Sequence, residues 1–516
     1  MTTMTHPRTS SFSELQGRLA EVEAAGRRGE HRSVVVVPAR TIDNRLEPSA
    51  ATQAYEERLL CSVLELRDPA LRMIYVTSAP VAPKIVDYYL SLLPPAHRAD
   101  ARARLTLVAV GDGTRRPLTE KLLDRPRLLE RIRRAVPTPE VCHLVPYRTT
   151  QREVELAVAL GLPLYGSDPV HAHLGTKSGS RAVFAAAGVP HPVGVENLTS
   201  VAGAIEAIRG LRAAAPGLRE LVMKLDDGVA GEGNAIIDLH ALPAPGTPGE
   251  ADLIGRRVAG LALESARLSA ADYLAKLGRG GGIVEERITA SELHSPSVQL
   301  QVTPAGELEL LSTHDQILGG PRGQTYLGCR FPAEPSYAPA ISALALRIGR
   351  RLADAGVIGR FAIDFVVARE GHGRWRPYAI EINLRKGGTT HPFQALVHLT
   401  GGSYDAETAT FLTRTGQPRH YVATDALEAP ALRGLGRDGV LGLARRHSDL
   451  RFDRMGQIGV AFHMLSSLDV LGRTGFTAIA GSADAAVALY ANVERTLLEQ
   501  AAAAAAPARA RHQRAA

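Results

Sequence analysis

The stretch AIEINLRKGGTTHP, residues 379–392, reads as a strand that stops at a pair of glycines. Side chains alternate between the two faces of a strand, so Glu381, Asn383 and Arg385 share one face. Two oxygen-bearing side chains and one guanidinium then converge on a single spot. This spacing predicts a place that holds a hard cation together with a negatively charged group.

A second strand is predicted from the stretch GRFAIDFVVA, residues 359–368. It places Asp364 between apolar neighbours, where an unpaired carboxylate would be costly. If the two strands are antiparallel partners, Asp364 lies beside Glu381 and Asn383. Ligation by oxygen alone favours Mg²⁺ or Mn²⁺ over zinc, with bridging phosphates completing the shell. The competing interpretation is a sheet face held by salt bridges to neighbouring arginines.

The composition limits the class of protein. The chain has 516 residues, 45% of them hydrophobic and 22% charged, which suits two or three globular domains. It contains no run of 18 apolar residues and no targeting pattern, so we expect a cytoplasmic protein without membrane contact. Cys61, Cys142 and Cys329 lack metal or redox spacing, in keeping with a reducing compartment.

The net charge of +7 does not indicate nucleic-acid binding. Three of the charges are arginines in the last 16 residues, and no basic cluster is interleaved with aromatic residues. The 60 basic residues include only six lysines, so the chain uses arginine as its ordinary cation. A lysine retained against this background is therefore a stronger sign of function than usual.

The organisation of the chain changes near residue 166. Strand and helix patterns alternate before it, beginning with SVVVVPA, and predict an open parallel α/β sheet. Hairpins such as SVQLQVTPAGELELLS follow and predict antiparallel strands, so the fold class is α/β plus α+β. The expected segments are a flexible N-terminus 1–32, an α/β domain 33–165, a second domain 166–415, a C-terminal domain 416–500 and a disordered tail 501–516.

Two lysines stand where phosphate groups could bind. Lys177 precedes a predicted helix over 178–187, whose free N–H groups favour an anion, although a surface lysine is the simpler explanation. Lys224 lies on a strand before a loop containing Gly231 and Gly233, which would let backbone N–H groups approach phosphate oxygens. A flexible hairpin loop is an equally good interpretation of that stretch.

The stretch GIVEERITASELHSP, residues 282–296, carries Glu285, Glu286 and Glu292 after an apolar strand. Such a segment could offer backbone groups to an adenine edge and a carboxylate to ribose hydroxyls. A solvated acidic strand end is the favoured alternative when the stretch is taken alone.

The order of these motifs over about 166–400 resembles the ATP-grasp superfamily. The resemblance implies an ATP-grasp fold preceded by an α/β domain, with a lid subdomain at about 190–288. Lys177 and Lys224 would contact ATP phosphates, and the loop 227–234, with Gly231 and Gly233, would close over them. The hinge would run from Glu285 and Glu286 to Ile288 and hold adenine, while Glu292 would take the ribose hydroxyls.

The resemblance also assigns the reacting end of the site. Asp364, Glu381 and Asn383 would bind two Mg²⁺ ions, and Arg385 would hold an anion. The glycine pair 387–388 would offer backbone N–H groups near the reacting carbonyl, with Gly388 counted among the catalytic residues. One departure is Ala362, where many D-alanine–D-alanine-type ligases have arginine, which leaves open whether Arg360 takes that role.

Several stretches further resemble the pheganomycin-type peptide ligases, over about 34–495. They include GDGTRRPLTEKLLDRP, GTKSGSR, THDQILGGPRGQTYLGCRFPA and EINLRKGGTTHP. The resemblance implies ATP-dependent formation of an amide between a small-molecule carboxylate and an amino-acid or peptide amine, through an acyl phosphate, with ADP released. Substrate contacts would come from Asp315, Gln316, Arg322 and Gln324. Two alternatives are left open, namely an ATP-grasp ligase that uses a non-amine acceptor and a non-catalytic nucleotide-binding protein. The chain could also form a homodimer.

Overall fold

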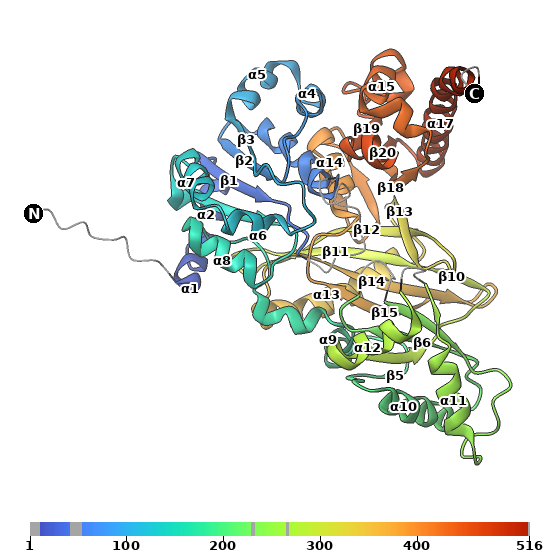
Figure 1. Cartoon of the computed structure of the whole chain (residues 1–516). Coiled ribbons are helices and arrows are strands. Elements are labelled where there is room, and N and C mark those ends of the chain that lie inside the picture. The colour runs from blue at the N-terminus through green and yellow to red at the C-terminus, as the bar shows by residue number, and fades with distance from the viewer. Residues whose placement is uncertain (1–10, 42–53, 229–232, 265–267, 514–516) are drawn as a thin grey trace, which may run out of the picture.

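The computed structural model describes residues 11–41, 54–228, 233–264 and 268–513. An α/β region, a large antiparallel sheet and a smaller lobe surround a central junction (Figure 1). No helix within these described ranges is both long enough and apolar enough to cross a membrane.

The N-terminal region contains the predicted parallel α/β sheet. Its four strands are arranged in the order β3-β2-β1-β4, and all the pairs are parallel. Beyond these strands, Leu164 forms an isolated parallel bridge with Leu144. The strands are β1 Arg32–Val37, β2 Leu71–Thr77, β3 Leu105–Ala109 and β4 Cys142–Pro146. The helices are η1 Glu57–Arg67 (a 3-10 helix), α4 Pro83–Leu92, α5 Pro95–Arg104, α6 Leu118–Leu123, α7 Pro126–Ala135, η2 Pro139–Val141 and α8 Gln151–Leu160.

The prediction of a flexible segment over 1–32 is wrong for the described residues 11–32. They form α1 Phe12–Gln16, which contacts α8, and α2 Leu19–Arg27, which packs on β1 and β4. The side chain of Gln16 bonds both backbone groups of Leu164, accepting from its N–H at 2.7 Å and donating to its carbonyl at 3.0 Å. Buried apolar residues at helical spacing, including Leu19 and Val22, supply the packing energy that a short isolated helix lacks.

A nine-stranded antiparallel sheet forms the centre of the molecule. Its order is β10-β14-β11-β12-β13-β18-β20-β19, and β15 also pairs with β14. The predicted pairing of the two decisive strands is present, with Asp364 opposite Glu381. The strands are β10 Glu292–His294, β11 Pro296–Val302, β12 Leu308–Gly319, β13 Thr325–Phe331, β14 Gly359–Arg369, β15 Arg376–Asn383, β18 His420–Glu428, β19 Gly459–His463 and β20 Arg473–Ala480.

The C-terminal residues 416–500 do not form the separate domain that the sequence predicts. Their strand β18 pairs with β13, so that Arg330 faces Val422, and extends the central sheet without a break. The helices that accompany this sheet are η3 Pro169–Gly175, α9 Lys177–Ala186, α13 Ala338–Asp354, α14 Thr390–Thr400, α15 Leu432–Arg446, η4 Ser448–Leu450, α16 Ser466–Leu471 and α17 Ala483–Gln513. A two-stranded sheet contains β16 Ser403–Asp405 and β17 Thr410–Leu412.

The predicted disordered tail from residue 501 is helical as far as Gln513, as the end of α17. Alanine is the strongest helix former, so the alanine-rich sequence extends the helix that precedes it.

The third sheet forms a smaller lobe over the extent of the predicted lid subdomain 190–288. Its antiparallel order is β5-β9-β6-β7-β8, and its helices enclose a core of its own (Figure 1). The strands are β5 Gly194–Val195, β6 Glu220–Leu225, β7 Asn234–Asp238, β8 Ala262–Leu263 and β9 Gly282–Glu286, and the helices are α10 Val201–Ala214, α11 Glu250–Ala259 and α12 Ala270–Gly280.

One hydrophobic core joins the two ends of the chain. It contains Leu60 and Leu64 of η1 together with Phe331, Phe462 and Phe476 of the central sheet. The α/β region therefore rests on the strands contributed by the last hundred residues, and this contact fixes its position relative to the central sheet.

We expect Phe331→Ala to lower the free energy of unfolding by about 3–5 kcal/mol, because it leaves a cavity in this shared core. The ring is 1% exposed and stacks on Tyr421 with centroids 4.9 Å apart. Urea denaturation followed by circular dichroism measures the change. The control is Met455→Ala, at a side chain that is 93% exposed, and we expect a change within about 0.5 kcal/mol. Equal stability of both variants would contradict the shared core.

Candidate active site

A cavity of about 410 Å³ opens where the three sheets meet. Its walls come from β9 and the residues after it, from β12, β14 and β15, and from the loop that follows β15. The α/β region and the start of β20 close the remaining side. The site therefore draws on segments from almost the whole chain.

The predicted oxygen ligands meet on one wall of this cavity. Strand pairing sets Asp364 opposite Glu381 and Ala362 opposite Asn383. The Asp364 carboxylate accepts hydrogen bonds from the Ser297 hydroxyl at 2.6 Å and from the Asn383 amide at 3.1 Å. Burial and the neighbouring Glu381 raise the pKa of Asp364 to about 6. A bound divalent cation would relieve this repulsion, so the donor set fits Mg²⁺.

Lys177 is buried behind this wall, against Glu381, and does not itself line the cavity, so it is not a surface lysine. Its Nζ lies 2.9 Å from Oε1 of Glu381, and its side chain is 5% exposed. Thr176 caps the helix α9 by accepting from the N–H of Gly179, which fixes the helix start next to the strand. Burial tends to raise the pKa of Glu381, but Lys177 outweighs it and the pKa is lowered.

An ion pair with Glu285 holds the Lys224 side chain in place. The Lys224 Nζ lies 2.5 Å from one oxygen of Glu285, and Arg181 Nη1 lies 2.9 Å from the other. The Glu285 side chain is 3% exposed, so its carboxylate positions a cation inside the protein. The sequence predicted an adenine hinge here and did not predict this ion pair, which joins residues 61 positions apart in the chain.

The remaining hinge residues line the cavity, as far as Ile288. The backbone N–H of Glu286 is donated to the Val193 carbonyl at 2.8 Å, and its carboxylate accepts from the Val193 N–H at 2.9 Å. These bonds hold the end of β9 in place beside the cavity.

Glu292 does not reach the cavity, and its predicted contact with ribose is not supported by this arrangement. Its carboxylate pairs with Arg369 on the neighbouring strand β14. The side chain of the next residue, Leu293, lines the cavity instead, because alternate residues of a strand face opposite sides.

The glycine loop after β15 packs tightly over the site. A methyl group at Gly388 would lie 2.5 Å from the Tyr326 ring, so only glycine fits there. Both residues line the cavity together with Arg385. The N–H of Gly387 is donated to the Thr390 hydroxyl at 2.9 Å, which occupies one of the two amides predicted to face a substrate.

The predicted substrate residues separate into two groups. Gln316, Arg322 and Gln324 line the cavity. Asp315 faces the other side of β12, where it accepts hydrogen bonds from the Tyr337 hydroxyl at 2.6 Å and the Glu334 N–H at 2.9 Å. Burial raises the pKa of Asp315, and this side chain belongs to the interior of the protein.

Arg360 and Gly233 do not line the cavity. The other predicted lid glycine lies outside the described residues. Arg360 donates to the Gln301 side chain at 3.3 Å, and burial lowers its pKa. The position nearer the site is occupied by Ala362, so this arginine does not replace the missing one. Gly233 follows the loop and its carbonyl accepts from Leu225 N–H at 3.0 Å. Gly231 falls outside the described residues.

A further set of cavity residues was missed by the sequence analysis. The α/β region contributes Arg40, Tyr55, Arg58 and Tyr147, and the C-terminal strands contribute Asp425 and Arg473. Arginine is so common in this chain that no single arginine is distinctive, and no local motif joins residues this far apart in sequence.

Comparison with known proteins agrees with this geometry. The chain is 34% identical over 452 residues to the L-propargylglycine–L-glutamate ligase of Streptantibioticus cattleyicolor, covering 86% of this chain and 89% of that one. The family described as IQCH-like, ATP-grasp matches residues 169–247 and 263–407. The chain belongs to the ATP-grasp family. The resemblance noted from the motifs is thereby confirmed.

More distant similarities describe the fold of this ATP-grasp chain. It is 24% identical over 388 residues to the IQ motif-containing protein H of Danio rerio, covering 67% of this chain and 36% of that one. Its structure is similar to the biotin carboxylase of Campylobacter jejuni, with a TM-score of 0.53, 14% identity and 90% of each chain covered. The biotin carboxylase domain of 2-oxoglutarate carboxylase from Hydrogenobacter thermophilus gives the same TM-score and identity over 91% of this chain and 90% of that one. These structures confirm the predicted fold class.

We expect Asp364→Asn to weaken Mg²⁺-dependent nucleotide binding by roughly tenfold or more, because it removes a ligand charge. Its raised pKa means that the ionised carboxylate costs stability near neutral pH, so the melting temperature should stay equal or rise. Calorimetric titration with an ATP analogue and thermal unfolding measure the two effects. Glu407→Gln, on an exposed loop, is the control. Unchanged nucleotide binding in Asp364→Asn would exclude this metal site.

Glu381→Gln should behave differently from Asp364→Asn, because Lys177 then loses its carboxylate inside the protein. We expect the same loss of Mg²⁺-dependent binding, now with a lower melting temperature. The same two measurements apply. If the two variants changed stability in the same direction, the assignment of Lys177 to Glu381 would be wrong.

Proposed function

We propose that this ATP-grasp ligase joins the carboxylate of one amino acid to the amine of another amino acid or a peptide. ATP converts the carboxylate to an acyl phosphate, the amine displaces phosphate, and ADP and phosphate are released. The observation that carries the proposal is the wall formed by Asp364, Glu381 and Asn383 beside Arg385. The similarity to a ligase whose name gives two amino acids as its substrates supports the choice of substrate class.

The chemistry requires concentrated positive charge. Phosphoryl transfer to a carboxylate brings negative groups together, and fixed cations lower that barrier. The two buried lysines, Lys177 and Lys224, would face the phosphates, and Arg385 would hold the group in transfer. Asp364, Glu381 and Asn383 would hold Mg²⁺, as two ions, whose chemistry here is to neutralise phosphate oxygens.

The protein positions these cations before any ligand arrives. Glu285 fixes Lys224, and Glu381 fixes Lys177. Charges that are already in place need no reorganisation during the reaction. They therefore stabilise developing charge better than water does, because water molecules must first reorient. The close packing of Gly388 against Tyr326 likewise fixes the backbone next to Arg385.

The acyl phosphate must be shielded from water until the amine attacks. The junction of three sheets encloses the reacting wall on several sides. The hinge at Glu286 and Ile288 would hold the adenine at one end, which leaves the opposite end to the two amino-acid substrates.

We expect ADP and phosphate to be released only when a carboxylate and an amine are both present with ATP and Mg²⁺. The measurement starts with L-glutamate and L-propargylglycine, continues with the twenty proteinogenic L-amino acids in pairs, and identifies the products by mass spectrometry. Bicarbonate and a thiol replace the amine in control reactions. Formation of AMP and pyrophosphate would contradict the acyl phosphate, and product from bicarbonate or thiol alone would contradict the amine acceptor.

We expect Arg385→Ala to lower kcat by roughly 10²–10³-fold while KM for ATP changes little, because Arg385 acts on the group in transfer. Steady-state kinetics on the best substrate pair tests this. The matched control is Arg134→Gln, at a side chain that is 79% exposed on α7. A rise in KM for ATP with unchanged kcat would place Arg385 on the nucleotide and away from the reacting group.

A further inference from the structure

Tyr147 brings a phenol to the end of the cavity that holds Arg385. It directly follows strand β4, is 8% exposed and lines the cavity. The glycine loop after β15 rests on this stretch of chain. The Lys386 N–H is donated to the Tyr147 carbonyl at 3.2 Å, and Lys386 Nζ donates to the Pro146 carbonyl at 2.6 Å. These two bonds fix Tyr147 next to the loop that carries Arg385 and Gly388.

The hydroxyl of Tyr147 is contacted by a cation. Its oxygen accepts a hydrogen bond from Arg58 Nη1 at 3.4 Å, and no described residue accepts its proton. A donor on the oxygen stabilises the ionised phenol, whereas an acceptor for the proton would stabilise the neutral one. The hydrogen bonding of Tyr147 therefore favours loss of its proton.

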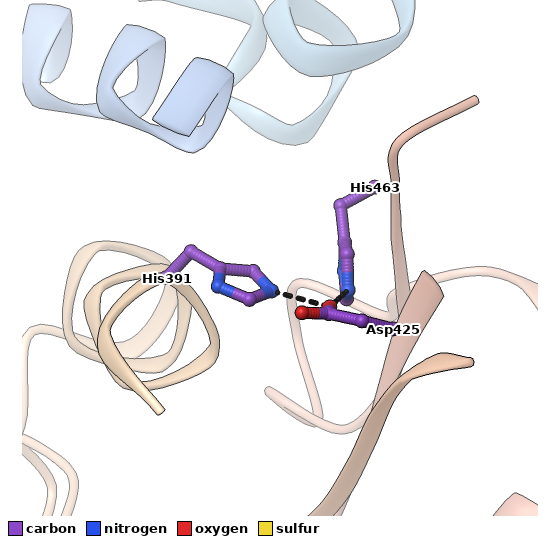
Figure 2. A group of neighbouring side chains, drawn as sticks. All are labelled: His391, Asp425 and His463. Atoms are coloured by element: carbon purple, nitrogen blue, oxygen red, sulfur yellow. Dashed lines mark hydrogen bonds and ion pairs between the residues drawn. The ribbon is translucent and has the colours of Figure 1, made fainter. Parts of the chain in front are cut away.

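A buried cluster holds Arg58 in this position. The guanidinium lies 2.7 Å from Oδ2 of Asp425. The other oxygen, Oδ1, contacts Nε2 of His391 at 3.0 Å and Nε2 of His463 at 2.7 Å (Figure 2). All three cluster side chains are buried, so these contacts keep the carboxylate in one orientation and Arg58 beside Tyr147.

The charges around the phenol act in the same direction as its hydrogen bond. Burial tends to raise the pKa of Tyr147, but three nearby arginines outweigh burial, and the pKa is lowered. In order of their effect these are Arg58, Arg385 and Arg40. Asp425 opposes them without cancelling their effect. The phenolate of Tyr147 thus forms closer to neutral pH than that of an ordinary tyrosine.

The other groups that could accept a proton in the cavity are engaged elsewhere. The described lining residues contain no histidine and five carboxylates, which are Glu285, Glu286, Asp364, Glu381 and Asp425. The first two lie at the hinge, and the next two form the wall that fits Mg²⁺. Burial tends to raise the pKa of Asp425, but Arg58 outweighs burial and lowers it well below its usual range, which makes this carboxylate a weak base. Tyr147 has what these groups lack, a lowered pKa and a proton that no described residue holds.

We propose that Tyr147 is the general base that takes a proton from the incoming amine. This inference rests on the proposed function, because an amino acid enters mainly in its ammonium form, which has no lone pair with which to attack. Arg58, held by Asp425, is the residue that positions the phenol.

The proton transfers balance in this scheme. The ionised Tyr147 oxygen removes one proton from the ammonium group, and the freed lone pair forms the C–N bond at the acyl carbon. The bond from that carbon to the phosphate oxygen then breaks, and its electrons stay with the oxygen. The departing phosphate takes the second proton that nitrogen loses, and Tyr147 returns its own proton to solvent.

The test compares an amino-acid amine with hydroxylamine, which is already unprotonated at neutral pH and needs no base. For Tyr147→Phe we expect kcat with the best amino-acid pair to fall roughly 10²–10³-fold. Hydroxamate formation from the same carboxylate should stay within about threefold of wild type, because the acyl phosphate still forms. Equal losses with both nucleophiles, or no loss with the amine, would overturn the proposal.

Tyr89→Phe is the matched control. Tyr89 lies on α4 and is 3% exposed, does not line the cavity, and has a buried hydroxyl without a hydrogen-bond partner among the described residues. We expect both reactions to continue at the wild-type rate in this variant. Thermal unfolding checks that Tyr147→Phe, which keeps the buried ring, folds as the wild-type protein does.

Ultraviolet titration separates this inference from the proposed function. Phenolate absorbance is followed against pH without substrates, and the trace of Tyr147→Phe is subtracted from that of wild type. We expect the difference to titrate below the usual tyrosine pKa of about 10. Arg58→Gln should move this signal to higher pH, which a merely structural role of Arg58 would not do. A Tyr147 signal at or above the usual pKa would refute the base, while failure of every wild-type pair to release ADP would refute only the ligase reaction.

Discussion

The pairing of β14 with β15 places two half-buried carboxylates side by side in the cavity wall, and neighbouring side chains offset their repulsion. Burial and the neighbouring Glu381 raise the pKa of Asp364, so the two carboxylates repel each other across this pair of strands. Lys177 reaches them because the capped start of α9 lies against β15. A cation bound between the two carboxylates would relieve the repulsion that remains, and this would strengthen its binding.

The same arrangement recurs around the cavity, where three of the cations are each paired with one carboxylate. Glu381 holds Lys177, Glu285 holds Lys224, and Asp425 holds Arg58. Buried pairs of this kind add little net stability, but they fix orientation. The cavity is thus lined by charges that cannot rotate away, which suits a reaction between negatively charged reactants.

The sequence predicted the fold class and the meeting of Asp364, Glu381 and Asn383 because both depend on local periodicity. The alternation at 381, 383 and 385 and a lysine in an arginine-rich chain are signals that need no partner. The pairing of Arg58 with Asp425 joins residues 367 positions apart, and nothing near either residue announces the other. The continuation of the central sheet into β18 was missed for the same reason, because the composition of a strand does not determine which strand it pairs with.

The insertion of the C-terminal strands into the central sheet sets an order of events during synthesis. The parallel strands of the α/β region emerge from the ribosome first, whereas Asp425 and His463 are added late. Until then Arg58 lacks its carboxylate and the shared core lacks Phe462 and Phe476. A nascent chain therefore holds the carboxylates of β14 and β15 before it holds Asp425 and Arg473, so the complete cavity exists only once nearly the whole chain has been translated.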